Sequence, residues 1–154
     1  MCTIRIGGER AEFLTVTLVG RSYPASNDYW DGNWIRAVVK VTAGGFRGEV
    51  GGDLRAEELL EFYQQLVPLF ETLSGEATFS TMEGWLSIRV SGDGHGHMNL
   101  RCEVRDQAVD GNTLTFRLGL DQTFLRPMLS ELGRAVSEFP VIGGQPSPRD
   151  PQEY

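Results

Sequence analysis

The sequence HMNLRCEVR, residues 97–105, alternates polar and apolar side chains without a break. A period of two places the apolar side chains on one face of a β-strand and the polar ones on the other. Such a strand is typical of an antiparallel sheet with one face in water and one face covered. Cys102 belongs to the apolar face, so we expect a buried free thiol there.

The same alternation recurs on both sides of this stretch. It predicts strands at residues 3–6, 12–19, 34–41, 46–50, 77–80, 86–90 and 114–120. Two segments instead carry apolar residues three or four positions apart, as amphipathic helices do: residues 59–73 and 125–139. The order of strands, helix, strands, helix predicts an α+β fold. We expect a curved antiparallel sheet of about seven or eight strands with two amphipathic helices packed on one face.

The ends of the first helix carry their own signals. Asp53 is a favourable N-cap, and Gly75 is typical of the residue that stops a helix. Pro68 removes a backbone hydrogen bond within this segment, so we expect a kink or a break there.

The length of 154 residues corresponds to one domain. We expect a single α+β domain over residues 1–142. Residues 143–154 form a Pro/Gly-rich segment that buries too little to order itself, so we expect a flexible tail. The tripeptide Asp-Gly-Asn occurs at 31–33 and 110–112, but the two halves otherwise align poorly, and we do not predict an internal repeat.

Charge and hydropathy restrict the partners and the compartment. The chain has 14 Lys and Arg against 21 Asp and Glu, a net charge of -7, so we expect neither nucleic acid nor an anionic membrane as a partner. It lacks both the apolar core of a signal peptide and the ~18 apolar residues of a membrane span, which predicts a soluble, cytoplasmic protein. The polar face of the predicted sheet is more basic than the whole chain, a hint of a partner surface. Its charged residues are Arg36, Lys40, Arg89, Arg101, Glu103, Arg105 and Arg117.

An aromatic and acidic stretch, NDYWDGNW, occupies residues 27–34. Asp-Gly and Gly-Asn favour turns, so this stretch predicts a turn that leads into the strand at Trp34. A turn does not explain Tyr29 and Trp30, because aromatic side chains in a loop must pack on the domain or on a partner. Both interpretations remain open on the sequence alone.

The chain offers few groups for chemistry. His95 and His97 are two apart and share a face, but a metal site needs a third ligand, such as Asp93 or Glu103. Asp28 and Asp31 would need a defined separation across a cleft to act as an acid–base pair, and so close in a loop they more often serve as turn formers or caps. The glycine-rich segments match neither the dinucleotide nor the P-loop pattern. We therefore predict no catalytic residue, no metal and no cofactor, with His95 and His97 as weak metal candidates.

Three motifs carry a family resemblance: DYWDGNW at 28–34, LDQT at 120–123 and FPV at 139–141. Through them, residues 16–143 resemble a largely uncharacterised bacterial family that includes WapI-type immunity proteins. The resemblance implies a non-enzymatic inhibitor that masks a toxin domain, often a nuclease with a basic cleft. On that hypothesis, the partner-binding residues are Asp28, Tyr29, Trp30 and Asp31, aromatic anchors flanked by charge.

Two other classes of function compete with this one. A small-molecule-binding module would show an elongated cavity between the sheet and its helices. A hydrolase would need Asp28, Asp31 or His97 to converge in one cleft. We rank a binding protein first, whether an immunity protein or an uncharacterised structural or interaction protein, then the ligand module, then the enzyme. The sequence leaves the partner, the ligand and the oligomeric state open.

Overall fold

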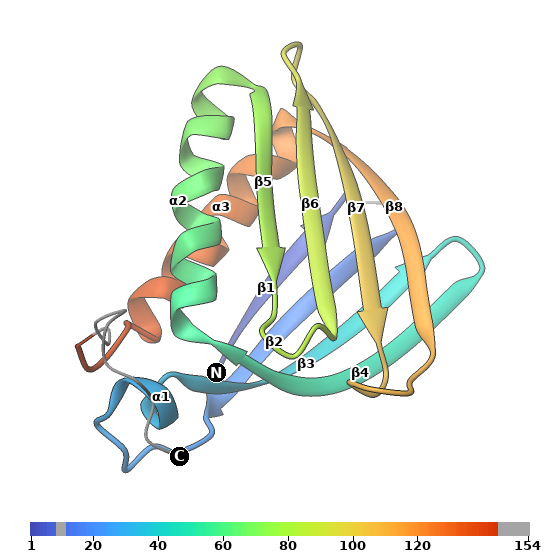
Figure 1. Cartoon of the computed structure of the whole chain (residues 1–154). Coiled ribbons are helices and arrows are strands. Elements are labelled where there is room, and N and C mark those ends of the chain that lie inside the picture. The colour runs from blue at the N-terminus through green and yellow to red at the C-terminus, as the bar shows by residue number, and fades with distance from the viewer. Residues whose placement is uncertain (9–11, 145–154) are drawn as a thin grey trace.

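The computed structural model describes residues 1–8 and 12–144. Within them it contains eight antiparallel strands, two long helices and one short helix (Figure 1). The first half consists of β1 (Cys2–Gly7), β2 (Phe13–Arg21), α1 (Tyr29–Gly32), β3 (Trp34–Ala43), β4 (Phe46–Arg55) and α2 (Ala56–Thr72). The second half consists of β5 (Ser74–Ser80), β6 (Leu86–Asp93), β7 (His97–Arg105), β8 (Thr113–Asp121) and α3 (Gln122–Glu138). The predicted α+β class, the strand number and the two amphipathic helices are confirmed.

The strands form two sheets, where the alternation predicted one curved sheet. Each sheet has four strands in sequence order, β1-β2-β3-β4 and β5-β6-β7-β8. Helix α2 separates β4 from β5, so these two strands do not pair. Alternation shows that one face of a strand is covered but does not show what covers it. Each half runs through four strands and then a long helix, an order of elements that was not predicted as a repeat.

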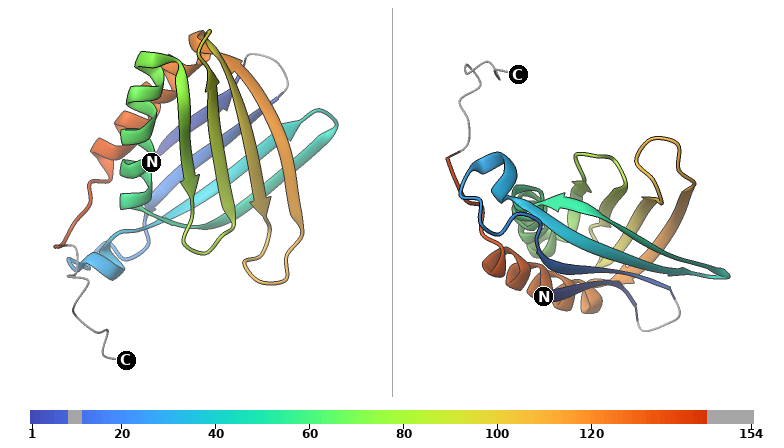
Figure 2. Two further views of the ribbon diagram at one scale, coloured as in Figure 1. Left: turned by 45° about the horizontal axis from the view of Figure 1, so that its top comes forward. Right: turned by 90° about the horizontal axis from the view of Figure 1, so that it is seen from below.

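One hydrophobic core lies between the two sheets and the two long helices. Helix α2 packs on β5, helix α3 packs on β1, and the two helices pack on each other. Figure 2 shows both helices together on the side of the molecule where β1 and β5 lie. The helices therefore cover the first strand of each sheet, while the rest of each inner face meets the other sheet.

Helix α2 begins and ends at residues other than those predicted. Strand β4 continues through Asp53 to Arg55, which is the N-cap of α2. The Arg55 amide donates to Glu58 Oε1 at 2.7 Å, as in a capping box. The helix ends at Thr72, and its C-cap Leu73, two residues before Gly75, adopts the left-handed conformation with φ 60°. Pro68 lies inside α2, which runs without a break to Thr72. Asp53 and Gly75 are thus strand residues, which pair with β3 and β6.

Trp85 joins the two sheets and was not singled out from the sequence. It is buried, and its indole Nε1 donates to the Asp53 carbonyl on β4 at 2.8 Å. Its ring lies against Gly52, where a Cβ would come within 2.4 Å of the indole. The turn between β5 and β6 is therefore anchored on the last strand of the other sheet.

The predicted buried free thiol at Cys102 is confirmed. Burial raises the pKa of Cys102 to about 12, so the thiol is un-ionised and unreactive at neutral pH. Most of the predicted flexible tail, residues 145–154, lies outside the described residues. In the part of the chain that the structure describes, no helix is long and apolar enough to span a membrane.

Candidate functional site

The aromatic–acidic loop, residues 22–33, connects β2 to β3 and contains the single turn of α1. Asp28 is the N-cap of this turn: its carboxylate accepts from the amides of Trp30 at 2.8 Å and Asp31 at 3.3 Å, and from Ser26 Oγ at 2.9 Å. The Ser26 hydroxyl and then these amides lower the pKa of Asp28. Asp28 is thus a capping residue, and the predicted turn is a short helix that delivers the chain to β3 at Trp34.

Arg55, the last residue of β4, is fully buried and contacts the backbone of α1. Its Nη1 and Nη2 atoms donate to the carbonyls of Trp30 at 2.7 Å and Tyr29 at 2.8 Å, and its Nε pairs with Glu57. Its guanidinium also lies over three rings, at 4.8 Å from the Trp34 centroid, 5.3 Å from Tyr29 and 5.4 Å from Trp30. A buried cation needs such compensation, and the aromatic residues of the loop supply much of it.

Asn33 ties the loop to the segment that follows α3. It is fully buried; its Nδ2 donates to the carbonyls of Tyr29 at 2.8 Å and Ile142 at 2.9 Å, and its Oδ1 accepts from the Ile142 amide at 2.9 Å. Arg21 adds two bonds across the same junction, to the carbonyls of Gly32 and Pro140. The DYWDGNW and FPV motifs, more than a hundred positions apart, therefore form one unit.

Two glycines allow this close approach. A Cβ on Gly32 would lie 2.4 Å from Ile142 Cδ1 and 3.0 Å from the Ser26 carbonyl oxygen, so a larger residue would displace the Ile142 side chain. Gly143 has φ 71°, and a Cβ on it would lie 2.6 Å from the Tyr29 amide. Gly32 has no positive φ, so packing against the C-terminal segment, and not its backbone conformation, favours glycine at this position of the motif.

The four predicted partner-binding residues lie together on α1 and its cap. Trp30 is 41% exposed, Asp28 and Asp31 are exposed, and Tyr29 is half-buried. Tyr29 meets Trp30 edge to face with centroids 5.3 Å apart. Tyr29 thus packs on the domain, while Trp30 packs on Arg55 and still presents surface to solvent, so partner binding through Trp30 stays a prediction.

The histidine pair lies elsewhere. Asp93 Oδ1 accepts from the backbone amides of His95 at 2.7 Å and His97 at 3.1 Å, and these bonds, that of His95 first, lower the pKa of Asp93. Among the described residues, no group of three metal-ligating side chains includes them. Asp93 instead shapes the β6–β7 connection through the backbone.

The groups that a hydrolase would need are not brought together. Figure 1 places the β6–β7 connection, with His97 at the start of β7, at the opposite end of the molecule from α1. Asp28, next to α1, is already used as a cap. No cleft therefore joins these residues, and the geometry gives no support for acid–base catalysis by them.

A cavity in the core tests the ligand-module alternative. It measures about 20 Å³, room for roughly one water molecule, and its lining is apolar. Both sheets and both long helices contribute to it, through Ile4, Ile6, Val16, Leu59, Phe62, Phe79, Ile88 and Leu132. This cavity is too small for a ligand.

Sequence reasoning missed the two buried polar residues that organise the loop. Asn33 was assigned only to a turn, and Arg55 was not singled out at all. The concentration of Tyr29, Trp30 and Trp34 is the only local signal that a cation lies nearby. It does not identify which of the thirteen arginines that cation is, because Arg55 reaches the loop only through pairing of β3 with β4.

A known protein family matches most of the chain, including this site. Residues 5–140 match the model of the family described as Immunity protein WapI-like family. The match includes the loop, Arg55 and the start of the segment that follows α3. No curated protein matches the chain.

Proposed function

This chain belongs to the WapI-like immunity protein family, and from that premise we propose that it binds and neutralises a basic toxin domain through the aromatic–acidic loop. The contacts are Asp28, Tyr29, Trp30 and Asp31, and the chain acts by masking its target and catalyses no reaction. An acidic immunity protein of this kind would meet its toxin in the cytoplasm.

The observation that carries the proposal is that Trp30 is partly exposed to solvent while its backbone is fixed by a hydrogen bond to the buried Arg55. Trp30 remains 41% exposed although its carbonyl is bonded to the buried Arg55. Tryptophan is among the residues that contribute most at protein interfaces. Because Asp28 and Arg55 already order α1, little conformational entropy is lost when Trp30 meets a partner.

Charge supports the choice of a basic partner. Asp28 and Asp31 flank the exposed indole, and the whole chain carries a net charge of -7. A basic toxin domain would be attracted over a distance and would associate quickly. Carboxylates at the rim of an aromatic contact also orient the partner.

The test is a pull-down from the native host with the wild-type chain and with Trp30→Ala and Asp31→Ala. Phe46→Ala and Asp110→Asn are matched controls, because Phe46, at the start of β4, is 66% exposed and Asp110 is exposed on the β7–β8 connection. We expect a basic partner that the two controls retain and that both loop variants lose, with all four variants folded by circular dichroism. A partner held equally by every variant would return the loop to a purely packing role. Recovery of no partner by the wild-type chain would count against the inhibitor function itself.

A further inference from the structure

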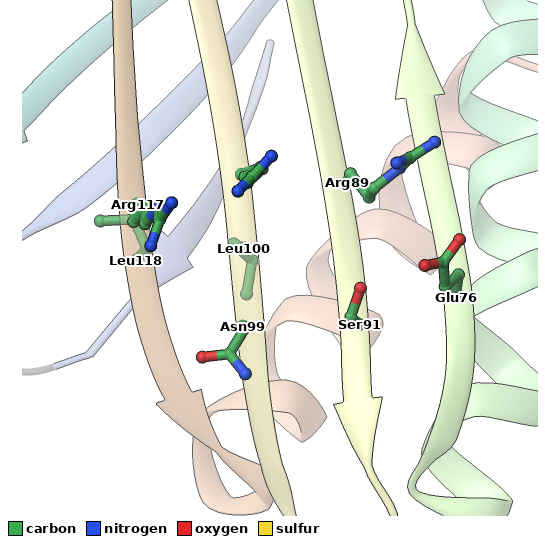
Figure 3. A pocket seen from close by; sticks show the side chains of 8 residues that line it. Glu76, Arg89, Ser91, Asn99, Leu100, Arg117 and Leu118 are labelled. Carbon is green, nitrogen blue, oxygen red and sulfur yellow. The ribbon is translucent and has the colours of Figure 1, made fainter.

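Three arginines form a continuous row across the outer face of the second sheet. Arg89 on β6 lies directly opposite Arg101 on β7, and Arg101 lies directly opposite Arg117 on β8. All three side chains are exposed, and all three line a shallow hollow of about 290 Å³ (Figure 3). Since neighbouring strands are ~4.8 Å apart, the row places three positive charges across about 10 Å.

In the part of the chain that the structure describes, no acidic side chain is paired with this row. Within the described residues, none of the three guanidinium groups forms a salt bridge with a carboxylate. Glu76 lies at the edge of the same hollow, and Figure 3 shows it beside Arg89 without an ion pair. Like charges directly opposite each other on adjacent strands destabilise a sheet, so the row has a cost that no salt bridge among residues 1–8 and 12–144 offsets.

The first sheet arranges its charges in the opposite way. On its outer face Arg36 lies opposite Asp53, and Lys40 lies opposite Glu49. These two basic residues have acidic cross-strand neighbours, as expected when exposed charges serve only solubility and strand pairing. Arg5 and Arg47 on the same face lie opposite Thr15 and Thr42, so no two basic residues that the structure describes there are directly paired. That explanation does not extend to the second sheet.

Short side chains flank the row on both sides. Ser91, Asn99 and Gly119 follow it towards one end of the strands, and Ser87 and Thr115 towards the other. Glu103, between Ser87 and Thr115, is directed to Arg105 at 3.6 Å. The backbone of a partner can therefore come close to the sheet while the arginines reach around its side chains.

We propose that Arg89, Arg101 and Arg117 form a binding surface for an acidic segment of a protein partner, separate from the aromatic–acidic loop. Each guanidinium can hold a carboxylate through two parallel hydrogen bonds. In an extended segment, alternate residues share one face at ~6.6 Å intervals, so two acidic side chains match the length of the row. This surface does not depend on the toxin proposed above.

The charge distribution favours a protein over a nucleic acid. The rest of the chain is strongly acidic, and a long polyanion passing over the row would also meet that repulsion. A protein partner needs only a local acidic patch. The hollow is open and broad, which suits a peptide backbone better than an enclosed small molecule.

The test measures binding of a short fluorescent peptide that alternates glutamate with serine, by fluorescence anisotropy at low salt. The same peptide with glutamine in place of glutamate is the uncharged control, and a single-stranded oligonucleotide is the competing polyanion. Arg101→Gln removes the centre of the row. Arg36→Gln is the matched protein control, because Arg36 is an exposed arginine that has an acidic cross-strand neighbour.

We expect the wild-type chain to bind the glutamate peptide and not the glutamine peptide. Arg101→Gln should raise the Kd by up to about fivefold, and the triple Arg89→Gln, Arg101→Gln, Arg117→Gln variant should abolish binding, while Arg36→Gln leaves it unchanged. Thermal unfolding adds a second readout: Arg101→Gln should raise the Tm by relieving repulsion, and Arg36→Gln should not.

Three results would overturn the proposal. They are no binding of the glutamate peptide by the wild-type chain, equal loss in Arg36→Gln and Arg101→Gln, and tighter binding of the oligonucleotide with the same dependence on Arg101. The last result would assign the row to nucleic acid instead of protein. The peptide assay does not involve Trp30, so its outcome is independent of the pull-down.

Discussion

Arg55 is the residue on which the candidate site depends most directly. Two carbonyls of α1, one carboxylate and three aromatic rings surround its buried guanidinium. A buried charge is tolerated only when its partners replace the water that it has lost. The loop and the arginine thus stabilise each other, and the exposed position of Trp30 is a consequence of that arrangement.

Replacing Arg55 with methionine should lower the free energy of unfolding by about 3–5 kcal/mol, because Glu57 and two carbonyls lose their donor in the interior. Urea unfolding measures the change. Arg47→Met is the control, since Arg47 lies exposed on the same strand and should lose about 0.5 kcal/mol or less. An equal loss in both variants would show that the buried cluster contributes nothing specific.

At the scale of the element, the first turn of α2 combines a cap with an unusual acid. Glu58 accepts the Arg55 amide at 2.7 Å, yet burial raises the pKa of Glu58 to about 7, although the Arg55 amide opposes that shift. Between pH 4.5 and 7 the folded state therefore holds a proton on Glu58 that the unfolded state releases. The contribution of Glu58 to stability is present below pH 4.5 and is lost as the pH rises through 7.

Glu58→Gln should remove this dependence while keeping an acceptor for the cap. Wild-type stability should fall between pH 5 and pH 8 by roughly 1–2 kcal/mol more than that of the variant, a figure reduced for the partial exposure of Glu58. Urea unfolding at the two pH values measures the difference. If both proteins respond equally to pH, Glu58 ionises normally in the folded state.

The strands could be predicted well at this scale, and their pairing could not. Alternation within residues 97–105 identified β7 and its buried thiol because the period of two is a local property. The same pattern placed Arg89, Arg101 and Arg117 on a polar face. That these residues stand in one row depends on the register of β6, β7 and β8, which connection lengths and packing decide.

At the scale of the whole molecule, Trp85 adds a specific contact between the two sheets to the core that they share. Its indole fills the space over Gly52 and donates to the carbonyl of the next residue on β4. The contact crosses from the β5–β6 turn to the last strand of the first sheet. It helps to set the orientation of the two halves around their common core.

Gly52→Ala should destabilise the protein by about 1–3 kcal/mol, because the added methyl group would overlap the Trp85 ring and force the two sheets apart. Gly51→Ala is a close control: a Cβ there would meet nothing nearer than 3.7 Å, so its stability should change by less than about 0.5 kcal/mol. Urea unfolding followed by tryptophan fluorescence measures both variants. A Gly52→Ala protein as stable as the Gly51→Ala protein would mean that the Trp85 ring moves aside freely.

The sequence by itself determined the α+β class, the strands, the two long helices and the family resemblance that Asp28, Trp30 and the later motifs carry. These features rest on periodicity, capping and motif identity, all of which are local. The tertiary structure alone decided that the strands divide into two sheets, that Arg55 and Asn33 brace the loop, and that three arginines align. Each depends on which distant segments meet, and an alternating strand is equally compatible with any partner that covers its apolar face.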